Sequence, residues 1–378
     1  MRVCSALGTK PLFPHLLPSQ ALVVDRSGPA PRQKNIFRRG KTRGAMLKNA
    51  RQEHMRMKYL SYAIFVPLQI VFFPLAILGV LLTAYKQIVV SKRLGVSQTA
   101  VEIINGRWTM HVFGLRHDDA TAALMSALPN TSKLGLWLVL WPLWVQARIA
   151  GQALLYPRIP AAGDESIADM VAARTMHFDS VIDRAIESVD QFVLLGAGYD
   201  TRAYGNFAAS GVTVFEVDQP AVQEHKRLMI EAAGIRCDHV HFVPVDFRVD
   251  DLFSKLAASG FDASRKTLFL WEGVSLYLSA EQVAATLAML RQLAASGSVL
   301  VADLYADRLV QTLGKANINE KVLEMTNETL EFGLPLASNW QQVLADFVAS
   351  HALQQGETHF LGTNNNAGPY AVVVEMIC

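Results

Sequence analysis

Residues 191–200 read QFVLLGAGYD, and this stretch decides the fold. An apolar run, FVLL, leads directly into Gly196, Ala197 and Gly198, where glycines let the backbone turn tightly and approach a ligand closely. Such a turn is typical of the carboxyl edge of a parallel sheet. The pattern is GxGxxT, with Thr201 at the position of the third glycine, so the turn alone is a weak indication of a nucleotide site.

Short runs rich in Val, Ile, Leu and Phe recur after residue 163, and helix-length segments separate most of them. The runs lie at residues 191–195, 212–217, 240–245, 267–271, 298–304, 357–361 and 370–377. Strands that alternate with helices indicate βαβ units. We therefore predict an α/β domain with a doubly wound, mostly parallel sheet.

Acidic residues end the next predicted strands. Asp218 follows Gly198 by 20 residues, where an acidic side chain can accept hydrogen bonds from both hydroxyls of a ribose. Glu216 points to the same side by strand alternation and is the second candidate. Both could instead be solvated carboxylates at the end of a strand.

The third and fourth strands also end in acidic residues. Asp246 and its aromatic neighbour Phe247 are suited to bind an exocyclic amine and to cover a purine ring. Glu272 ends the next strand. Four consecutive strands thus finish with glycine or acid, which a ligand that carries adenosine and positive charge would explain.

Five motifs carry a resemblance to a known family: ARTMHFD at 173–179, VDQFVLLGAGYDTRAY at 189–204, TVFEVDQP at 213–220, VPVDF at 243–247 and LFLWEGVSLYL at 268–278. In this order they resemble the leucine carboxyl methyltransferase and related bacterial O-methyltransferase family. The resemblance covers about residues 163–378. It implies a class I methyltransferase (Rossmann-like) fold that uses S-adenosyl-L-methionine, and a sheet that closes with an antiparallel last strand at 370–377.

The resemblance also implies which residues bind the cofactor. It assigns Arg174 to the methionine carboxylate, Gly196 and Gly198 to the floor beneath the methionine, Asp218 to the ribose, Asp246 and Phe247 to the adenine, and Glu272 to the region of the amino group. A guanidinium forks onto a carboxylate, and carboxylates favour a nearby ammonium or sulfonium, so the residue types agree. From the residues alone, Arg174 could equally be a surface arginine paired with Asp179 or Asp183.

The catalytic residue stays open. Methyl transfer from a sulfonium requires no metal, and we expect no metal site. A carboxylate acceptor needs no general base at neutral pH, whereas a hydroxyl benefits from one. His177, close to Arg174, and Tyr204, just past the glycine turn, are the candidates. Arg202 could face either the cofactor or the acceptor.

Two other classes of protein remain as alternatives. One is a nucleotide-binding scaffold without turnover. The other is a nicotinamide-dependent (NAD(P)) oxidoreductase, which Thr201 disfavours because a third glycine is expected there.

Residues 59–85 contain no charged side chain. A helix of 27 residues is about 40 Å long, enough to cross a bilayer, and Tyr59, Tyr62 and Tyr85 lie near its ends, as interfacial anchors do. We predict a transmembrane helix at 59–85, with a buried core helix as the alternative. A membrane would then be one partner, and the methyl acceptor would be a small molecule or lipid-like.

Residues 86–162 are predicted to connect this helix to the 163–378 domain. They include the apolar segment 134–147, whose 14 residues fall short of the ~20 that span a bilayer. Trp137, Trp141 and Trp144 share one face of a helix. The segment would lie at the interface or against the first helix, or it would pack on the catalytic domain.

Charge divides the chain. Residues 1–58 carry a net charge of +11 and the remaining 320 residues a net charge of −9. We predict that residues 1–58 form a disordered basic arm, which could be a transit peptide, a lipid-binding patch or an upstream extension before another start at Met46, Met55 or Met57. The acidic body is a poor match to a nucleic-acid binder, so we expect no nucleic-acid partner.

The membrane topology is left open by charge. Six basic residues between Lys41 and Lys58 favour a cytoplasmic N-terminus, but a start at Met55 reverses this count. Because the cofactor is a cytoplasmic metabolite, we expect the catalytic domain in the cytoplasm. Three widely spaced cysteines, Cys4, Cys237 and Cys378, suit a reducing compartment.

Overall fold

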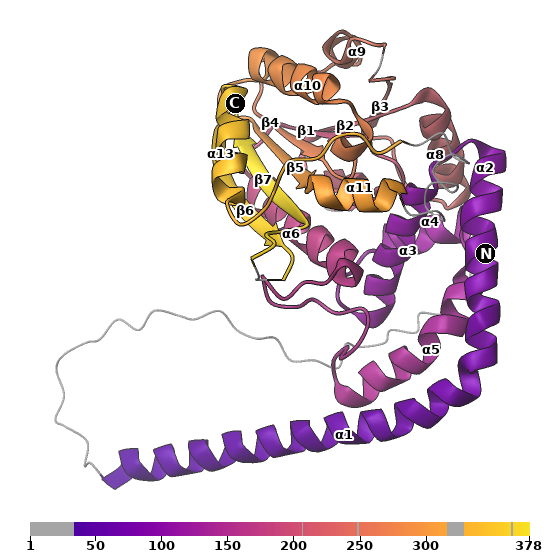
Figure 1. The fold of residues 1–378 in the computed structure, drawn as a ribbon, viewed down its shortest axis with the longest axis vertical. Coiled ribbons are helices and arrows are strands. Elements are labelled where there is room, and N and C mark those ends of the chain that lie inside the picture. Colours follow the sequence, from indigo (N-terminus) through magenta and orange to yellow (C-terminus); the bar gives the residue numbers. More distant parts are fainter. Residues whose placement is uncertain (1–33, 206, 248, 316–328, 364–365) are drawn as a thin grey trace, which may run out of the picture. The chain divides into compact units, whose positions relative to one another are not determined.

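The computed structural model of the chain describes residues 34–205, 207–247, 249–315, 329–363 and 366–378, with the backbone only for 34–51, 54, 209, 314 and 315. The chain forms two units, Met1–Glu53 and His54–Cys378. The second contains the sheet and, contiguous with it, the segment expected to be a connector (Figure 1).

The sheet has seven strands in the order β3-β2-β1-β4-β5-β7-β6. Their bounds are β1 Gln191–Leu195, β2 Thr213–Asp218, β3 Val240–Pro244, β4 Thr267–Trp271, β5 Val299–Tyr305, β6 Gln354–Leu361 and β7 Ala371–Ile377. Strands β1 to β5 are mutually parallel, whereas β7 is antiparallel to both of its neighbours, β5 and β6. The predicted Rossmann-like sheet with an antiparallel last strand is confirmed.

Helices cover both faces of the sheet (Figure 1). One hydrophobic cluster joins the sheet to α3 Gln98–Phe113, α4 Asp119–Ala127, α6 Met170–Ala185 and α8 Pro220–Ala232. A second cluster joins the other face to α9 Leu252–Ala258, α10 Ala280–Leu293 and α13 Trp340–Ser350. Shorter helices are α7 Phe207–Ser210 and α11 Asp307–Lys315. All five residues of β1 are buried, as expected of a strand between two helical layers.

Side chains in the loops set the starts of several helices. The hydroxyl of Ser97 accepts from Ala100 N at 3.3 Å at the start of α3, and the Asp118 carboxylate accepts from Thr121 N at 2.8 Å at the start of α4. Gly114 ends α3 with φ +75°, a left-handed conformation that glycine adopts without strain. Short polar residues and glycine at these positions therefore define the helix bounds.

Helix α1 spans Lys34–Ala84 and continues through a π-helix, Tyr85–Val90, into α2, Ser91–Leu94. The prediction of a disordered arm is therefore wrong for residues 34–58, which lie in α1; residues 1–33 fall outside the described residues. The physical reason is composition. The segment is rich in Arg, Lys and Met, which have good helix propensity, and the helix that begins there continues into the apolar stretch.

Helix α5, Lys133–Ala150, packs antiparallel against α1, so the apolar segment 134–147 lies against the first helix. Phe72 stacks on Trp141 with ring centroids 4.6 Å apart. A Cβ placed on Gly79 would lie 2.5 Å from the carbonyl oxygen of Gly135, so two glycines let the backbones approach closely. We call α1 from Met55 onward together with α5 the helical hairpin.

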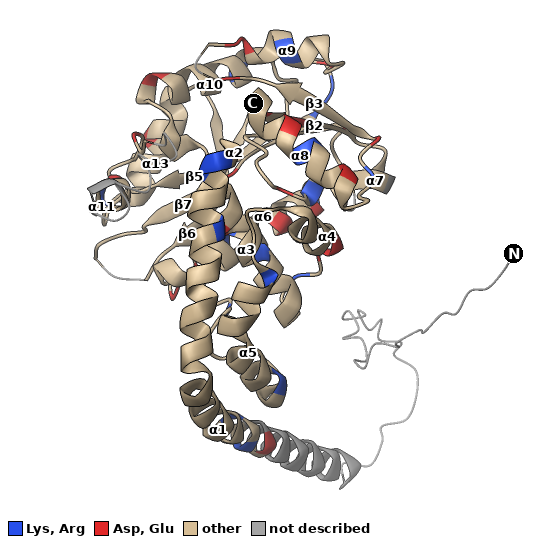
Figure 2. Ribbon diagram, turned by 90° about the vertical axis from the view of Figure 1, so that its right-hand side faces the viewer, with Lys and Arg blue, Asp and Glu red and all other residues tan. Residues whose placement is uncertain are grey.

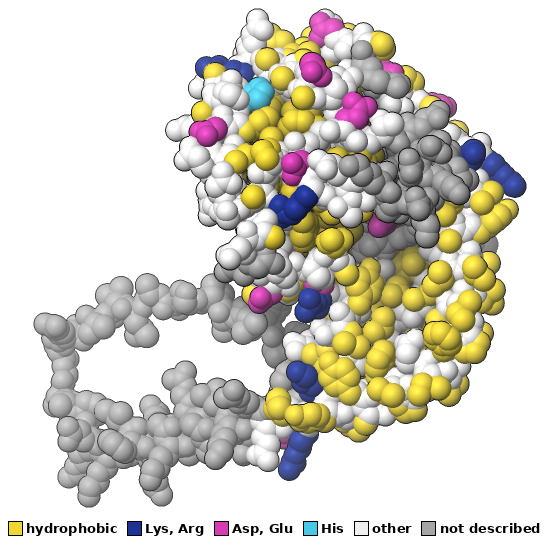
Figure 3. Space-filling model, viewed as in Figure 1, with side chains coloured by type: hydrophobic (Ala, Val, Ile, Leu, Met, Phe, Trp, Pro, Cys, Tyr) yellow, Lys and Arg dark blue, Asp and Glu magenta, His cyan; other side chains and the backbone are white. Residues whose placement is uncertain are grey.

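The outward face of the helical hairpin is apolar (Figure 3). Ile70 and Val71 are 69% and 71% exposed, and the stretches of α1 and α5 between their charged ends carry no charged residue (Figure 2). Met55–Leu94 is the one helix among the described residues that is long and apolar enough to cross a membrane. Isolated exposed leucines are ordinary, but a contiguous apolar face is typical of an interaction site.

Candidate functional site

The turn after β1 is built on two glycines in left-handed conformations, Gly196 with φ +73° and Gly198 with φ +42°. A Cβ on Gly196 would collide with the side chain of Val274. The carboxylate of Asp218, at the end of β2, accepts from Gly198 N at 2.6 Å and from Gln219 N at 2.7 Å. The structure therefore brings the two predicted glycines and the predicted acid together in one rigid turn.

Arg174 is buried beside two acids. Its Nη1 lies 2.8 Å from the Asp303 carboxylate, and its Nε lies 3.2 Å from Glu272. Only 3% of its side chain is exposed, which excludes the alternative of a surface arginine paired with Asp179 or Asp183. Arg174 and Glu272, each predicted separately to bind the cofactor, thus meet at the end of β4.

Two more guanidinium groups converge on Glu272. Arg107 Nη2 lies 3.0 Å from its Oε2, and Arg202 pairs with the same oxygen. Both arginines also bind Asp200, at 2.9 Å and 2.6 Å. We call these five residues, Arg107, Arg174, Arg202, Asp200 and Glu272, the arginine cluster.

The charges of the arginine cluster hold its acids ionised. Burial raises the pKa of Glu272, but the guanidinium groups of Arg202, Arg107 and Arg174 lower it below its ordinary value. Burial likewise raises the pKa of Asp200, and Arg107 and Arg202 more than reverse this, so that the pKa falls well below the usual range. Both acids of the cluster are therefore ionised at neutral pH.

Sequence reasoning missed Arg107, Asp200 and Asp303. Asp200 lies inside the quoted motif, and Asp303 stands in β5, so their positions could have suggested a role. Arg107 lies on α3, in the predicted connector, where no motif marks it. Its 2% exposed side chain enters the cluster only because α3 packs beside the glycine turn, with Ala100 Cβ 3.5 Å from a Cβ placed on Gly198.

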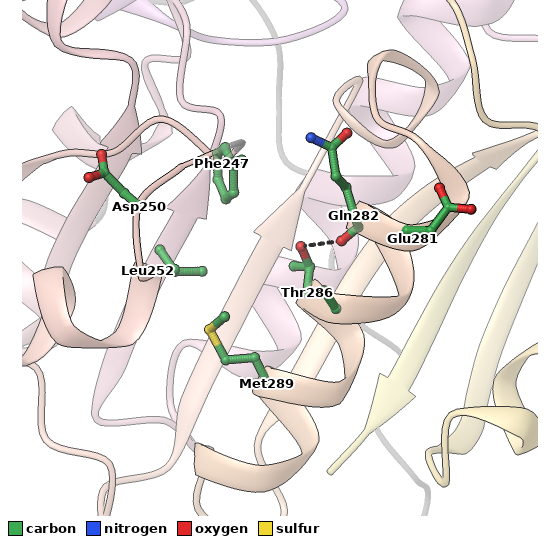
Figure 4. Close-up of a pocket in the computed structure, with 8 residues that line it drawn as sticks. Phe247, Asp250, Leu252, Glu281, Gln282, Thr286 and Met289 are labelled. Atoms are coloured by element: carbon green, nitrogen blue, oxygen red, sulfur yellow. Dashed lines mark hydrogen bonds between the residues drawn. The ribbon is translucent and has the colours of Figure 1, made fainter.

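A cavity of about 310 Å³ lies beyond the end of β3 (Figure 4). Phe247 and Asp250 form one wall, and Gln282 and Met289 of α10 form the opposite wall. The predicted Phe247 therefore lines a space that admits a ring. Asp246 directly precedes it and donates its backbone N–H to Asp250 Oδ2 at 2.9 Å.

The two candidate bases lie outside the arginine cluster. His177 stacks on His359, with ring centroids 4.5 Å apart. Tyr204 is 9% exposed in the core, where burial and then the carboxylate of Glu216 raise its pKa well above the ordinary value. Glu216 itself is fully buried and pairs with Lys226 at 2.7 Å, so it is no longer a second candidate for a ribose.

Comparison with known sequences finds relatives of part of the chain. Residues 143–291 match the family model described as leucine carboxyl methyltransferase. A protein of Mycobacterium avium (strain 104), provisionally described as an S-adenosyl-L-methionine-dependent methyltransferase, is 38% identical over 139 residues, 36% of this chain and 44% of that protein. A protein of Mycolicibacterium gilvum with the same description is 32% identical over 198 residues, 50% of this chain and 64% of that protein. The chain spans about half the length of these relatives.

Solved structures of low sequence identity also resemble the chain. One is a protein of Thermobifida fusca provisionally described as a methyltransferase, with 16% identity and a TM-score of 0.40, covering 68% of this chain and 93% of that one. Another is magnesium protoporphyrin IX methyltransferase from Synechocystis, with 12% identity and a TM-score of 0.36, covering 55% of this chain and 84% of that one.

Proposed function

We propose that this chain is an S-adenosyl-L-methionine-dependent methyltransferase. One observation carries the proposal: the ends of β1 to β4 present four features that a nucleotide-like ligand needs. These are a glycine turn after β1, an acid at the end of β2 that can bind ribose hydroxyls, a cavity lined by an aromatic ring after β3 and a buried acid after β4. Residues 143–291, which match the leucine carboxyl methyltransferase family model, contain all four. The position of these residues within the matched segment supports the proposal.

The residues present fit this cofactor. Asp218 is held by two backbone N–H groups and keeps lone pairs for ribose hydroxyls. Phe247 lines a cavity beside Gln282, suited to adenine. In the arginine cluster, Arg174 would bind the methionine carboxylate and Glu272 would bind the ammonium group. Each of these side chains already pairs with a group of opposite charge. The cofactor supplies an electrophilic methyl group.

The chain's own residues would act by alignment and exclusion of water. Helix α3 lies over the glycine turn and contributes Arg107, so the methionine end of the site is enclosed rather than open to solvent. In a displacement at a methyl carbon, the positioning of nucleophile and leaving group accounts for much of the rate. The acceptor is a carboxylate or a hydroxyl of a small or lipid-like molecule.

The helical hairpin supports a location at the membrane. The catalytic part would lie in the cytoplasm, where the cofactor is found. The outward face of the hairpin is apolar over a length sufficient to span a bilayer, and Gln146 hydrogen-bonds Ser61 at 3.3 Å between the two helices, so these polar groups do not face lipid. An acceptor that resides in the bilayer would reach an anchored enzyme directly.

Asp218→Ala should weaken binding of S-adenosyl-L-homocysteine by about 10- to 100-fold, because hydrogen bonds to a charged group contribute about 1.5–3 kcal/mol. The measurement is calorimetric titration of the full chain in detergent micelles. Asp238→Ala is the matched control, since Asp238 is an exposed acid.

If the folded wild-type chain binds no S-adenosyl-L-homocysteine, the methyltransferase assignment falls. Binding of NADH in its place would favour the oxidoreductase. Binding of the cofactor with no methyl transfer to any acceptor from membrane extracts would favour the scaffold.

The double change Ile70→Asp and Val71→Asp should abolish co-flotation of the chain with phosphatidylcholine and phosphatidylglycerol vesicles. Each charge near the centre of an inserted helix costs about 2.5–3.5 kcal/mol, and both side chains point outward. Leu228→Asp, at an exposed position on α8, is the control and should float as the wild type does. Unchanged flotation of the double variant would remove the membrane role of this face.

A further inference from the structure

A second cavity, of about 220 Å³, lies between α6, β6 and the loop before α6, and the proposed cofactor site does not include it. Its walls are Ile159, Pro160, Glu165, Ala173, Met176, His177, Ser180 and His359. Half of these side chains are apolar. Ile159 is 42% exposed at its edge, so an apolar surface leads into the cavity.

The other four wall residues are polar: Glu165, His177, Ser180 and His359. Ser180 Oγ accepts from Arg184 Nη1 at 3.1 Å. Glu165 is 1% exposed, and its Oε1 lies 3.2 Å from His359 Nε2. His359 stacks on His177 at an interplanar angle of 22°. The Nε2 atom of His177 is buried and has no hydrogen-bond partner among the described residues. A buried polar atom without a partner is costly, so this nitrogen indicates a ligand that would bind there.

The cavity favours an uncharged ligand. The second oxygen of Glu165 accepts from Gly163 N at 2.7 Å, so the carboxylate is already engaged by His359 and the backbone. Burial, and then the proximity of His359 and Arg184, lower the pKa of His177 to about 4, which keeps this imidazole neutral at pH 7. Arg184 is paired with Glu357 and Glu375. An anionic ligand would therefore be repelled by Glu165 and would have no unpaired cation to bind in this cavity.

The cavity lies on the same face of the sheet as Asp303, the acid that binds Arg174. Val373 of β7 is paired in register with His359 of β6 on one side and with Asp303 of β5 on the other. The three residues therefore lie side by side on neighbouring strands. Side chains paired in this way point to the same face, and strands lie about 4.8 Å apart. On α6, which covers this face, Arg174 and His177 are one turn apart. The cavity thus lies about 10 Å along the sheet from the acid that holds Arg174.

We propose that this cavity binds the hydroxyl end of the methyl acceptor, a neutral alcohol or phenol with an apolar body, and that His177 accepts the hydroxyl proton. The proposal rests on the proposed function, which it narrows from carboxylate or hydroxyl to hydroxyl. With its own proton on Nδ1, His177 offers the Nε2 lone pair to the hydroxyl.

In the reaction the acceptor oxygen forms a bond to the methyl carbon while the bond from that carbon to sulfur breaks. The electron pair of the broken bond stays on sulfur, which becomes a neutral thioether, and the hydroxyl proton passes to Nε2 of His177. Because His177 is a weak base, its Nε2 atom then releases the proton to water. No oxidant, reductant or metal is needed.

The test uses three single-ring probes of similar size and different charge: phenol, benzoate and benzylamine. Ligand-observed NMR titration of the full chain in micelles at pH 7 should show phenol bound at least tenfold more tightly than the other two. His177→Phe keeps the stacking on His359 but removes the acceptor, and should weaken phenol about tenfold. His177→Gln, which keeps a polar acceptor, should retain part of the affinity. His117→Phe, at a highly exposed histidine, should change nothing.

Equal binding of benzoate, or unchanged phenol affinity in His177→Phe, would overturn the proposal. Titration of the same samples with S-adenosyl-L-homocysteine separates this result from failure of the proposed function and verifies that each variant is folded. With radiolabelled S-adenosyl-L-methionine, wild type should convert phenol to anisole, and His177→Phe should do so at least 100-fold more slowly. Phenol bound at His177 without anisole, in a chain that binds the cofactor, would refute the role as acceptor site.

Discussion

Glu272→Gln should lower the free energy of unfolding by about 3 kcal/mol, the low end of the range for breaking a buried ion pair. The amide keeps the shape of the side chain but removes the charge on which Arg107, Arg174 and Arg202 converge. Each of these arginines still pairs with another acid, and this limits the loss of stability. The measurement is the melting temperature of the full chain, with an expected fall of roughly 4 °C for a unit that spans His54–Cys378.

Glu357→Gln is the matched control for this loss. Glu357 also binds an arginine, Arg184, but its side chain is 57% exposed, and exposed ion pairs contribute about 0–1 kcal/mol. Its melting temperature should therefore stay close to that of the wild type. Equal melting temperatures for Glu272→Gln and wild type would show that the arginine cluster does not stabilise the fold.

Arg107→Met should weaken binding of S-adenosyl-L-homocysteine by 100-fold or more. The substitution preserves much of the apolar stem but removes one of the guanidinium groups that Asp200 and Glu272 share. Their negative charges are then less fully compensated and repel the ligand's amino-acid carboxylate. Arg107→Lys should recover part of the affinity, because an ammonium keeps the charge but cannot bridge two acids as a planar fork does. The measurement is the same calorimetric titration.

Arg93→Met, on the exposed surface of α2, is the control and should bind as the wild type does. If Arg107→Met bound the cofactor with wild-type affinity, α3 would cover the site without taking part in it. The cofactor site would then be complete within residues 163–378.

Contacts from α2, which continues α1, and from α5 reach the cofactor site. Asn130, which is fully buried, donates to Ser91 Oγ at 3.1 Å in α2 and to the hydroxyl of Tyr199 at 3.3 Å beside the glycine turn. Trp137 of α5 meets Trp108 of α3 edge to face, with ring centroids 5.8 Å apart, next to Arg107. Residues 86–162 are thus part of the catalytic unit as well as a link to the hairpin.

The sequence predicted the sheet well, because the information for a buried strand is local. Continuous apolar runs bounded by glycine or acidic residues located all seven strands to within a few residues. Gly196, Gly198 and Asp218 could be placed together for the same reason, since parallel strands end at one edge of the sheet. The antiparallel direction of β7 came from the family resemblance.

The cavity at His177 could not be predicted in this way. Glu165, His177 and His359 come from a loop, a helix and an edge strand. His177 was a candidate base, but nothing in the sequence linked it to Glu165 or to His359, which is about 180 residues further along the chain. Only the stacking of α6 on β6 and β7 brings them together. The helical form of residues 34–58 was also missed, because a basic, weakly apolar segment shows no periodicity.

The sequence by itself determined the strands, the glycine turn and the acids at the ends of β2, β3 and β4. Apolar runs, turn-forming glycines and the residues that end a strand can all be read from short segments of the chain. Only the tertiary structure decided that Arg107 enters the cofactor site, that α5 lies on α1 and that Glu272 holds three guanidinium groups. Those contacts depend on how whole helices pack, and helix packing is set by side chains that are distant in sequence.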